Sequence, residues 1–392
     1  MNLPVSDFLN FVPYEGSDEL LIICSQVAVP RGKFGLSKFF GEWPINKLYI
    51  NTLKDDWYIN GLADVGNVER TMARVRKWLD TMSFKKVSTF GVSMGGFGAI
   101  FFGAHLKVDQ VYAFGAEHEL FIPFSKSKGH NKHQSPTAKS DFRALISNSA
   151  RNTRFTMFAG SLDLVDMYSM ARLADIPGVD LFYAENVNHS VTTWLNEQGK
   201  LVDFLQVLFA HQVSDEQLAD FQFVRMSPDN VALYSNVYAL LVAQEFLSRR
   251  RLNAEAEAIG NSLIALLPGH PLVIRLKAKQ LSKVRDYQGA LSTMEMALAL
   301  TPDEAKLYKE AAVYASKGGK TERALELIEK CLSLNANKLG FIQTKLEILL
   351  DAGMTEQALA FSTRVEHLFA TKEAKITFER LTSRLGSLPN SA

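Results

Sequence analysis

The sequence predicts an α/β domain with a mostly parallel sheet, followed by an all-α domain of helical repeats. Short apolar runs alternate with helical stretches between about residues 19 and 212, which is typical of a parallel sheet with flanking helices. After about residue 225 the strand-like runs disappear, and Ala, Leu, Glu and Lys dominate. Small residues then recur at intervals of 34, the spacing of a helical-hairpin array.

Six short runs, rich in branched or aromatic residues, predict strands at 20–24, 47–50, 86–92, 111–114, 155–159 and 180–184. Helices are expected between several of them, at 68–82, 95–105, 140–147 and 194–211. We place this first domain at residues 1–212 and interpret residues 213–236 as a linker and capping helix.

The repeats of the second domain, residues 237–392, are marked by alanines 34 apart: Ala256, Ala290, Ala324 and Ala358. Small residues at this interval are expected where two helices cross. The pattern resembles four tetratricopeptide (TPR) repeats at about 237–270, 271–304, 305–338 and 339–372.

Composition excludes several classes of protein. The 392 residues carry 43 Lys and Arg against 42 Asp and Glu, a net charge of +1, so a nucleic-acid-coating protein or a dedicated membrane-surface protein is not expected. The two cysteines, Cys24 and Cys331, are too far apart in sequence to indicate a disulfide framework or a cysteine zinc cluster. The N-terminus lacks a signal-peptide pattern, and no uncharged apolar run reaches the roughly 18–20 residues of a membrane span. We therefore expect a cytoplasmic protein without membrane insertion.

The most informative motif is G-x-S-x-G at Gly91–Gly95, directly after one predicted strand and directly before a helix. A serine at such a sharp turn has strained backbone geometry, which needs small neighbours and exposes the hydroxyl above the sheet. Ser93 is therefore the candidate nucleophile. The N–H of Met94, at the start of the helix, can stabilise an oxyanion.

An acid and then a histidine follow the next two strands downstream of this motif. Asp163 lies in the loop after the strand at 155–159, and His189 lies in the loop after the strand at 180–184. This order of serine, acid and histidine resembles the α/β-hydrolase superfamily over residues 19–212. The resemblance implies that Ser93 is the nucleophile, His189 the general base and Asp163 the orienting acid. Asp166 is the alternative acid, and we favour Asp163.

The same resemblance places a second oxyanion donor in the loop after the first predicted strand. This loop lacks the family's glycine-rich signature, and the backbone N–H of Gln26 or Val27 is the candidate. Trp57 and Tyr58 follow the second predicted strand and are candidate substrate-binding aromatics, because adjacent residues of an extended segment cannot both point inward. Residues 125–140 carry four lysines, 126, 128, 132 and 139, and are interpreted as a mobile loop or a basic lid.

The two domains together resemble bacterial proteins associated with surface-polysaccharide or glycoprotein biosynthesis. That resemblance implies a serine esterase, deacetylase or O-acyltransferase whose substrate is an acylated small molecule or glycan. The helical repeats would bind a protein partner or mediate self-association. The alternative is a catalytically inactive scaffold whose repeats recruit a partner. No cofactor is expected, and His130 and His133 lack a third plausible ligand for a metal.

Overall fold

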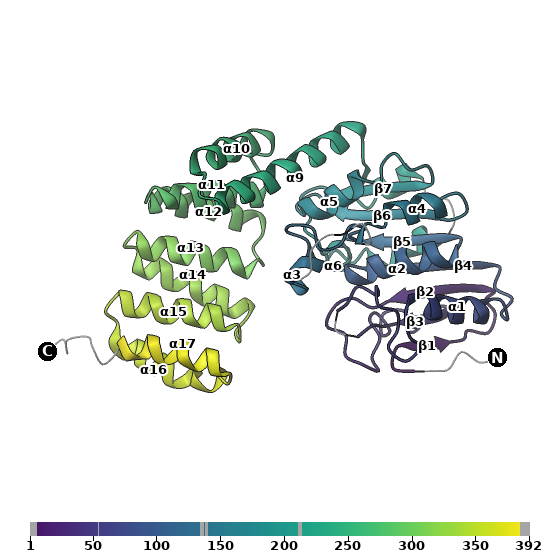
Figure 1. The fold of residues 1–392 in the computed structure, drawn as a ribbon, viewed down its shortest axis with the longest axis horizontal. Helices are drawn as coiled ribbons and strands as arrows, with labels where there is room; N and C mark the ends of the chain where they lie inside the picture. Colours follow the sequence, from purple (N-terminus) through teal and green to yellow (C-terminus); the bar gives the residue numbers. More distant parts are fainter. Residues whose placement is uncertain (1–5, 54, 134–136, 138–139, 211–213, 385–392) are drawn as a thin grey trace. The chain divides into compact units, whose positions relative to one another are not determined.

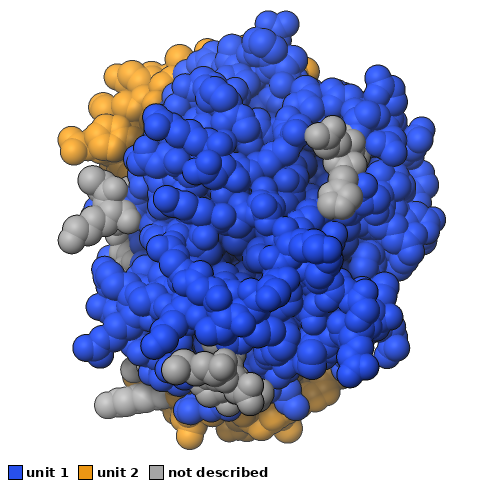
Figure 2. All heavy atoms as spheres, turned by 90° about the vertical axis from the view of Figure 1, so that its right-hand side faces the viewer, with its two compact units in different colours: residues 1–242 blue, residues 243–392 orange. Residues whose placement is uncertain are grey.

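The computed structural model describes residues 6–53, 55–133, 137, 140–210 and 214–384 (Figure 1). The chain forms two compact units, residues 1–242 and residues 243–392, coloured separately in Figure 2. Each unit is described by itself below.

Unit 1 is built around an eight-stranded sheet with the strand order β1-β3-β2-β4-β5-β6-β7-β8. The strands are β1 (Leu9–Val12), β2 (Glu19–Cys24), β3 (Asn46–Ile50), β4 (Lys86–Val92), β5 (Gln110–Phe114), β6 (Arg154–Gly160), β7 (Val179–Ala184) and β8 (Phe223–Arg225). Strands β2 to β7 pair in parallel, whereas β1 and β8 add antiparallel edges. The sheet is therefore mixed. The sequence analysis missed both edge strands because runs of three and four residues are too short to show a strand period.

The helices that lie wholly within unit 1 are α1 (Val68–Leu79), α2 (Met94–Leu106), α3 (Lys126–His130), α4 (Arg143–Ser149), α5 (Leu164–Ala171), α6 (Val191–Glu197), α7 (Leu201–Phe209) and α8 (Asp215–Ala219). The single helix predicted at 194–211 is wrong in its extent. It is replaced by α6 and α7, because Gly199 adopts a φ of +69° between them and interrupts the helical backbone. Residues 211–213 lie outside the described part of the chain.

Strand β2 shows why the sheet is covered on both faces. Its side chains alternate between two apolar clusters, with Leu20 and Ile22 in one and Leu21 and Ile23 in the other. The first cluster includes residues of α1 and α2, and the second includes residues of α6 and α7. A strand buried on both faces must be apolar throughout, which explains the run from residue 20 to residue 24.

Unit 2 is a TPR-like domain of helical hairpins. Its helices are α10 (Asn253–Leu266), α11 (Pro271–Lys283), α12 (Tyr287–Leu300), α13 (Ala305–Lys317), α14 (Thr321–Leu334), α15 (Leu339–Asp351), α16 (Thr355–Val365) and α17 (Lys372–Thr382). Three hairpins, α11–α12, α13–α14 and α15–α16, coincide with the three repeats predicted from residue 271 onward. The four alanines of the 34-residue series are all buried, consistent with close packing of the helices.

The segment predicted as a linker and capping helix, residues 213–236, lies within unit 1. Its helix, α9 (Pro228–Arg249), crosses the unit boundary, which lies after residue 242. The Tyr238 ring stacks on Tyr168 of α5, with centroids 3.9 Å apart, and its hydroxyl donates to the carbonyl of Pro123 at 3.0 Å. These contacts cover α5, so the first half of α9 is part of the α/β unit. None of the described helices is long and apolar enough to cross a membrane.

Enlarging a buried alanine of the repeat series should destabilise unit 2. Ala290 is fully buried in α12, whereas Ala299 of the same helix is exposed. We expect Ala290→Leu to lower the free energy of unfolding by about 1–3 kcal/mol, because the added methyl groups must displace packed neighbours. Urea unfolding monitored by circular dichroism measures this, and Ala299→Leu is the matched control. Equal stabilities for the two variants would contradict close packing at the predicted crossing.

Candidate active site

Ser93 lies at a strained turn between β4 and α2. Its φ of 58° and ψ of −123° are rare for a residue other than glycine. Close packing holds this turn, since a Cβ on Gly91 would lie 1.9 Å from the carbonyl oxygen of Gly95. The N–H of Ser93 donates to the carbonyl of Phe114 on the neighbouring strand at 2.8 Å. The G-x-S-x-G glycines are thus required by backbone approach.

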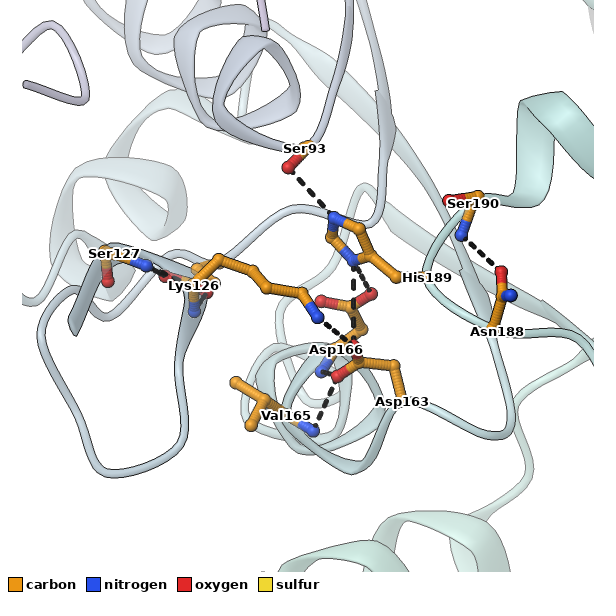
Figure 3. Close-up of polar contacts among 10 residues, drawn as sticks. Ser93, Lys126, Ser127, Asp163, Val165, Asp166, Asn188, His189 and Ser190 are labelled. Atoms are coloured by element: carbon orange, nitrogen blue, oxygen red, sulfur yellow. Dashed lines mark hydrogen bonds and ion pairs between the residues drawn. The ribbon is translucent and has the colours of Figure 1, made fainter. Parts of the chain in front are cut away.

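His189 lies in the loop between β7 and α6 and faces this serine (Figure 3). Its Nε2 lies 2.9 Å from the Ser93 Oγ, within hydrogen-bond distance. Gly115, directly after β5, has a φ of +56°, and a Cβ there would lie 3.0 Å from two atoms of the His189 ring. A side chain at this position would therefore press on the imidazole.

The acid in contact with His189 is Asp166. Its Oδ2 lies 2.6 Å from Nδ1 of His189, whereas Oδ2 of Asp163 lies 3.8 Å from the same atom (Figure 3). The preference for Asp163 stated from the sequence is therefore reversed. Asp163 is the N-cap of α5, where its carboxylate accepts from the N–H groups of Val165 and Asp166. The two aspartates are three residues apart, so one turn of the chain brings both toward the histidine.

The two carboxylates have different electrostatic surroundings. Burial raises the pKa of Asp166, the charge of Asp163 raises it further, and His189 opposes both. Burial also disfavours ionised Asp163, but Lys126 and His189 outweigh it and lower the pKa of that group to about 2. For His189, burial acts to lower the pKa, yet the Asp166 carboxylate prevails and the pKa lies above its ordinary value. Asp166 thus favours the imidazolium that a general base forms.

Two further side chains lie beside this trio, and the sequence analysis did not connect either of them with it. The Nζ of Lys126 lies 3.0 Å from Oδ2 of Asp163. Glu117, buried after β5, accepts from the backbone N–H groups of Lys126 and Ser127 at the start of α3. Glu117 was detectable in principle, because it is a polar residue that follows a strand at the edge carrying Ser93. Of the other lysines in the predicted lid, residue 139 lies outside the described residues.

Among the residues that the structure describes, one set of side chains has metal-ligand chemistry. The ligand atoms of Asp163, Asp166 and His189 lie within 4.8 Å of one another. The Lys126 ammonium already lies against one of these carboxylates, and the histidine Nε2 faces Ser93. We therefore interpret this set as a proton-transfer group. Of the H-x-x-H pair, His130 lies 3.6 Å from a carboxylate oxygen of Asp55.

Three backbone groups are candidate oxyanion donors. Met94 is the first residue of α2, so its N–H has no acceptor within the helix. Gln26 and Val27 follow the end of β2, and their N–H groups donate no hydrogen bond among the described residues. A Cβ on Gly95 would lie 2.3 Å from the carbonyl oxygen of Cys24, so this loop leaves the sheet beside the serine turn.

Trp57 and Tyr58 are not exposed at the site, and the prediction that one forms a binding wall is wrong. Both side chains are buried, and both residues have positive φ values, 54° and 59°. The segment is therefore a left-handed turn, in which neighbouring side chains need not point to opposite sides. The Tyr58 hydroxyl donates to the carbonyl of Ser25 at 2.7 Å, which holds the end of β2 in place.

A cavity of about 870 Å³ lies at the other end of the parallel strands from Ser93. Its lining includes the first residues of four parallel strands, Glu19, Lys86, Gln110 and Arg154. The face of unit 1 shown in Figure 2 is hollowed near its centre. Charged side chains around the cavity pair with one another, as Arg154 does with Asp180 at 2.7 Å. This cavity is at the amino ends of the parallel strands, so it is separate from Ser93.

Comparison with known proteins gives fold neighbours of low similarity. No protein-family profile and no curated protein matches the chain. Among solved structures, MamA is 15% identical with a TM-score of 0.30, covering 39% of this chain and 82% of its own. A thermophilic TPR protein of Thermus thermophilus is 18% identical with a TM-score of 0.33, covering 38% and 83%. YrrB, described as a TPR protein with an unusual peptide-binding site, is 16% identical with a TM-score of 0.30, covering 39% and 86%.

Glu117 should make the stability of the protein depend on pH. Burial raises the pKa of this carboxyl from 4.5 to about 7. A raised folded-state pKa stabilises the native protein fully below pH 4.5, and this contribution is lost as the pH rises through about 7. Relative to Glu117→Gln, wild type should therefore lose on the order of 3 kcal/mol of unfolding free energy between pH 4.5 and pH 8. Urea unfolding of both proteins at several pH values tests this, and parallel curves would contradict it.

Proposed function

We propose that unit 1 is a serine hydrolase of the α/β-hydrolase type. The observation that carries this proposal is the continuous hydrogen-bonded chain from Ser93 through His189 to Asp166. Nucleophile, base and orienting acid are in contact in the order that acyl transfer requires, although each follows a different strand. The strained serine turn and the free N–H groups beside it add the remaining parts of an acyl-transfer site.

The mechanism follows from these contacts. The Ser93 hydroxyl donates to Nε2 of His189, which accepts the proton as Oγ attacks an ester carbonyl. Asp166 holds Nδ1–H and stabilises the imidazolium that forms. Backbone N–H groups at Met94 and at Gln26 or Val27 stabilise the tetrahedral oxyanion. The imidazolium then protonates the leaving alcohol, and water or an acceptor hydroxyl resolves the acyl-enzyme.

The proposed substrate is an acylated glycan or small molecule, most simply an acetyl ester. Its support is the resemblance of the sequence to bacterial proteins of surface-glycan biosynthesis. Hydrolysis and transfer share the same acyl-enzyme and differ only in the acceptor hydroxyl. The TPR-like repeats are proposed to bind a protein partner or to mediate self-association, since helical-hairpin arrays present extended concave surfaces.

A second candidate function is an inactive scaffold whose repeats recruit a partner protein. The TPR-like hairpins of unit 2 favour this function, because such arrays commonly act by binding. The scaffold and the enzyme differ in one measurable property, the nucleophilicity of Ser93.

Single substitutions in the trio should separate these candidates. Wild type should hydrolyse p-nitrophenyl acetate and take up one fluorophosphonate adduct at Ser93. We expect Ser93→Ala and His189→Ala to lose about 10⁴-fold or more in kcat, and Asp166→Asn a similar factor. Asp163→Asn should stay within about tenfold of wild type, because asparagine also caps a helix. Turnover with intact-mass analysis after labelling measures these effects.

The pH profile provides an independent check on the base. His189 must be neutral to accept a proton, and its pKa lies above 6.5. The value of kcat/KM should therefore fall as the pH drops through an apparent pKa above 6.5. Wild-type protein that neither turns over nor labels would favour the scaffold, and equal loss in the Asp163 and Asp166 variants would contradict the assigned acid.

A further inference from the structure

The cluster around His189 holds more carboxyl groups than one base needs. Three carboxyl groups, those of Glu117, Asp163 and Asp166, are close enough to influence the same site from the β5–α3 loop and from α5. The charged groups that face them are His189, from the β7–α6 loop, and Lys126, from α3. Two neighbouring carboxylates normally share a proton unless a cation compensates them.

Few groups stabilise a negative charge on Asp166. Its side chain is 1% exposed, and Oδ1 has no hydrogen-bond partner among the described residues. Its other oxygen contacts His189, which is neutral when the site is ready to react. A permanent positive charge lies beside this pair of aspartates, because the Nζ of Lys126 is 3.0 Å from Oδ2 of Asp163.

The position of Lys126 is fixed from a different part of the unit. The buried Glu117 carboxyl accepts from the backbone N–H of Lys126 and, at 3.2 Å, from that of Ser127. Ser125 caps the same helix through Lys128 N–H, and the Ser127 hydroxyl accepts from the N–H of Phe121. The backbone is thus held while the lysine side chain reaches toward α5 (Figure 3).

We propose that Lys126 is a positioning residue whose ammonium compensates Asp163, so that Asp166 stays ionised and alone holds Nδ1 of His189. The proposal rests on the proposed function, but its electrostatic part concerns the cluster itself. In this arrangement Asp163 and Lys126 form a neutral pair beside the Asp166–His189 pair. Removing the ammonium leaves two adjacent carboxylates at one imidazole, and the proton affinity of the whole cluster rises.

The decisive experiment is an NMR titration of the histidine ring in the full chain. The His189 signal is identified by its loss in His189→Gln. In Lys126→Met the midpoint should rise, because the ammonium that disfavours the imidazolium is gone and the Asp163 carboxylate is left uncompensated beside His189. A nearby charge shifts a pKa by about 1–3 units, and we expect a rise of about one pH unit because Lys126 is partly exposed. Lys126→Arg should stay near wild type, because the charge is kept.

Two further variants distinguish an effect of the lost charge on the His189 midpoint from an effect of a changed structure. Lys126→Met combined with Asp163→Asn removes the second carboxylate together with its counter-charge and should return the midpoint to near the wild-type value. Lys132→Met removes an exposed charge from the same segment and should leave it unchanged. An unchanged midpoint in Lys126→Met, or an equal rise in Lys132→Met, overturns the proposal. Failure of the double variant to reverse the shift overturns it as well.

The acid limb of kcat/KM should move with the NMR midpoint across these variants. If wild type has no turnover, the proposed function fails while the NMR titration still decides the role of Lys126. If turnover is present and the midpoint does not respond to Lys126, the enzyme stands and only the positioning role fails.

Discussion

The backbone conformation of Ser93 is the constraint on which the rest of the site depends. A positive φ at this residue ends β4 and starts α2 within one step, which is possible only because the flanking glycines let the two segments approach closely. The same turn places the serine hydroxyl at the carboxyl edge of the parallel strands. In the sheet, β6 is the second strand from β4 and β7 is the third, and the loops that follow them reach the same edge. The strand order therefore determines which side chains can meet Ser93.

The sequence was sufficient to predict the alternating core and the serine–histidine contact. Strands buried on both faces and a glycine-flanked serine are local signals, visible in a single segment. The choice between Asp163 and Asp166 depends on how α5 starts, since the residue that caps the helix is occupied by backbone N–H groups. Sequence order alone does not show that the Asp163 carboxylate is already engaged by these N–H groups.

Trp57 and Tyr58 are residues whose environment could not be predicted from the sequence. The prediction assumed an extended backbone, in which neighbouring side chains alternate, but these residues adopt left-handed values that no composition rule indicates. The edge strands β1 and β8 were missed for a related reason, because their pairing is defined by partners distant in sequence. By contrast, the helical repeats of unit 2 depend on contacts between neighbours, so a fixed sequence interval predicts them well.

The stacking of Tyr238 on Tyr168 has a consequence for how the chain can be divided. A truncation after residue 212 or 236 would remove an aromatic surface from α5, the helix that carries Asp166, and would expose the apolar cluster around Ile122 and Val165 to water. A fragment starting at residue 237 would carry Tyr238 and Val242 as unprotected apolar side chains. Fragments cut at either of these positions would therefore expose apolar surface and tend to aggregate. A cut that separates the two halves has to lie in the middle of α9 instead.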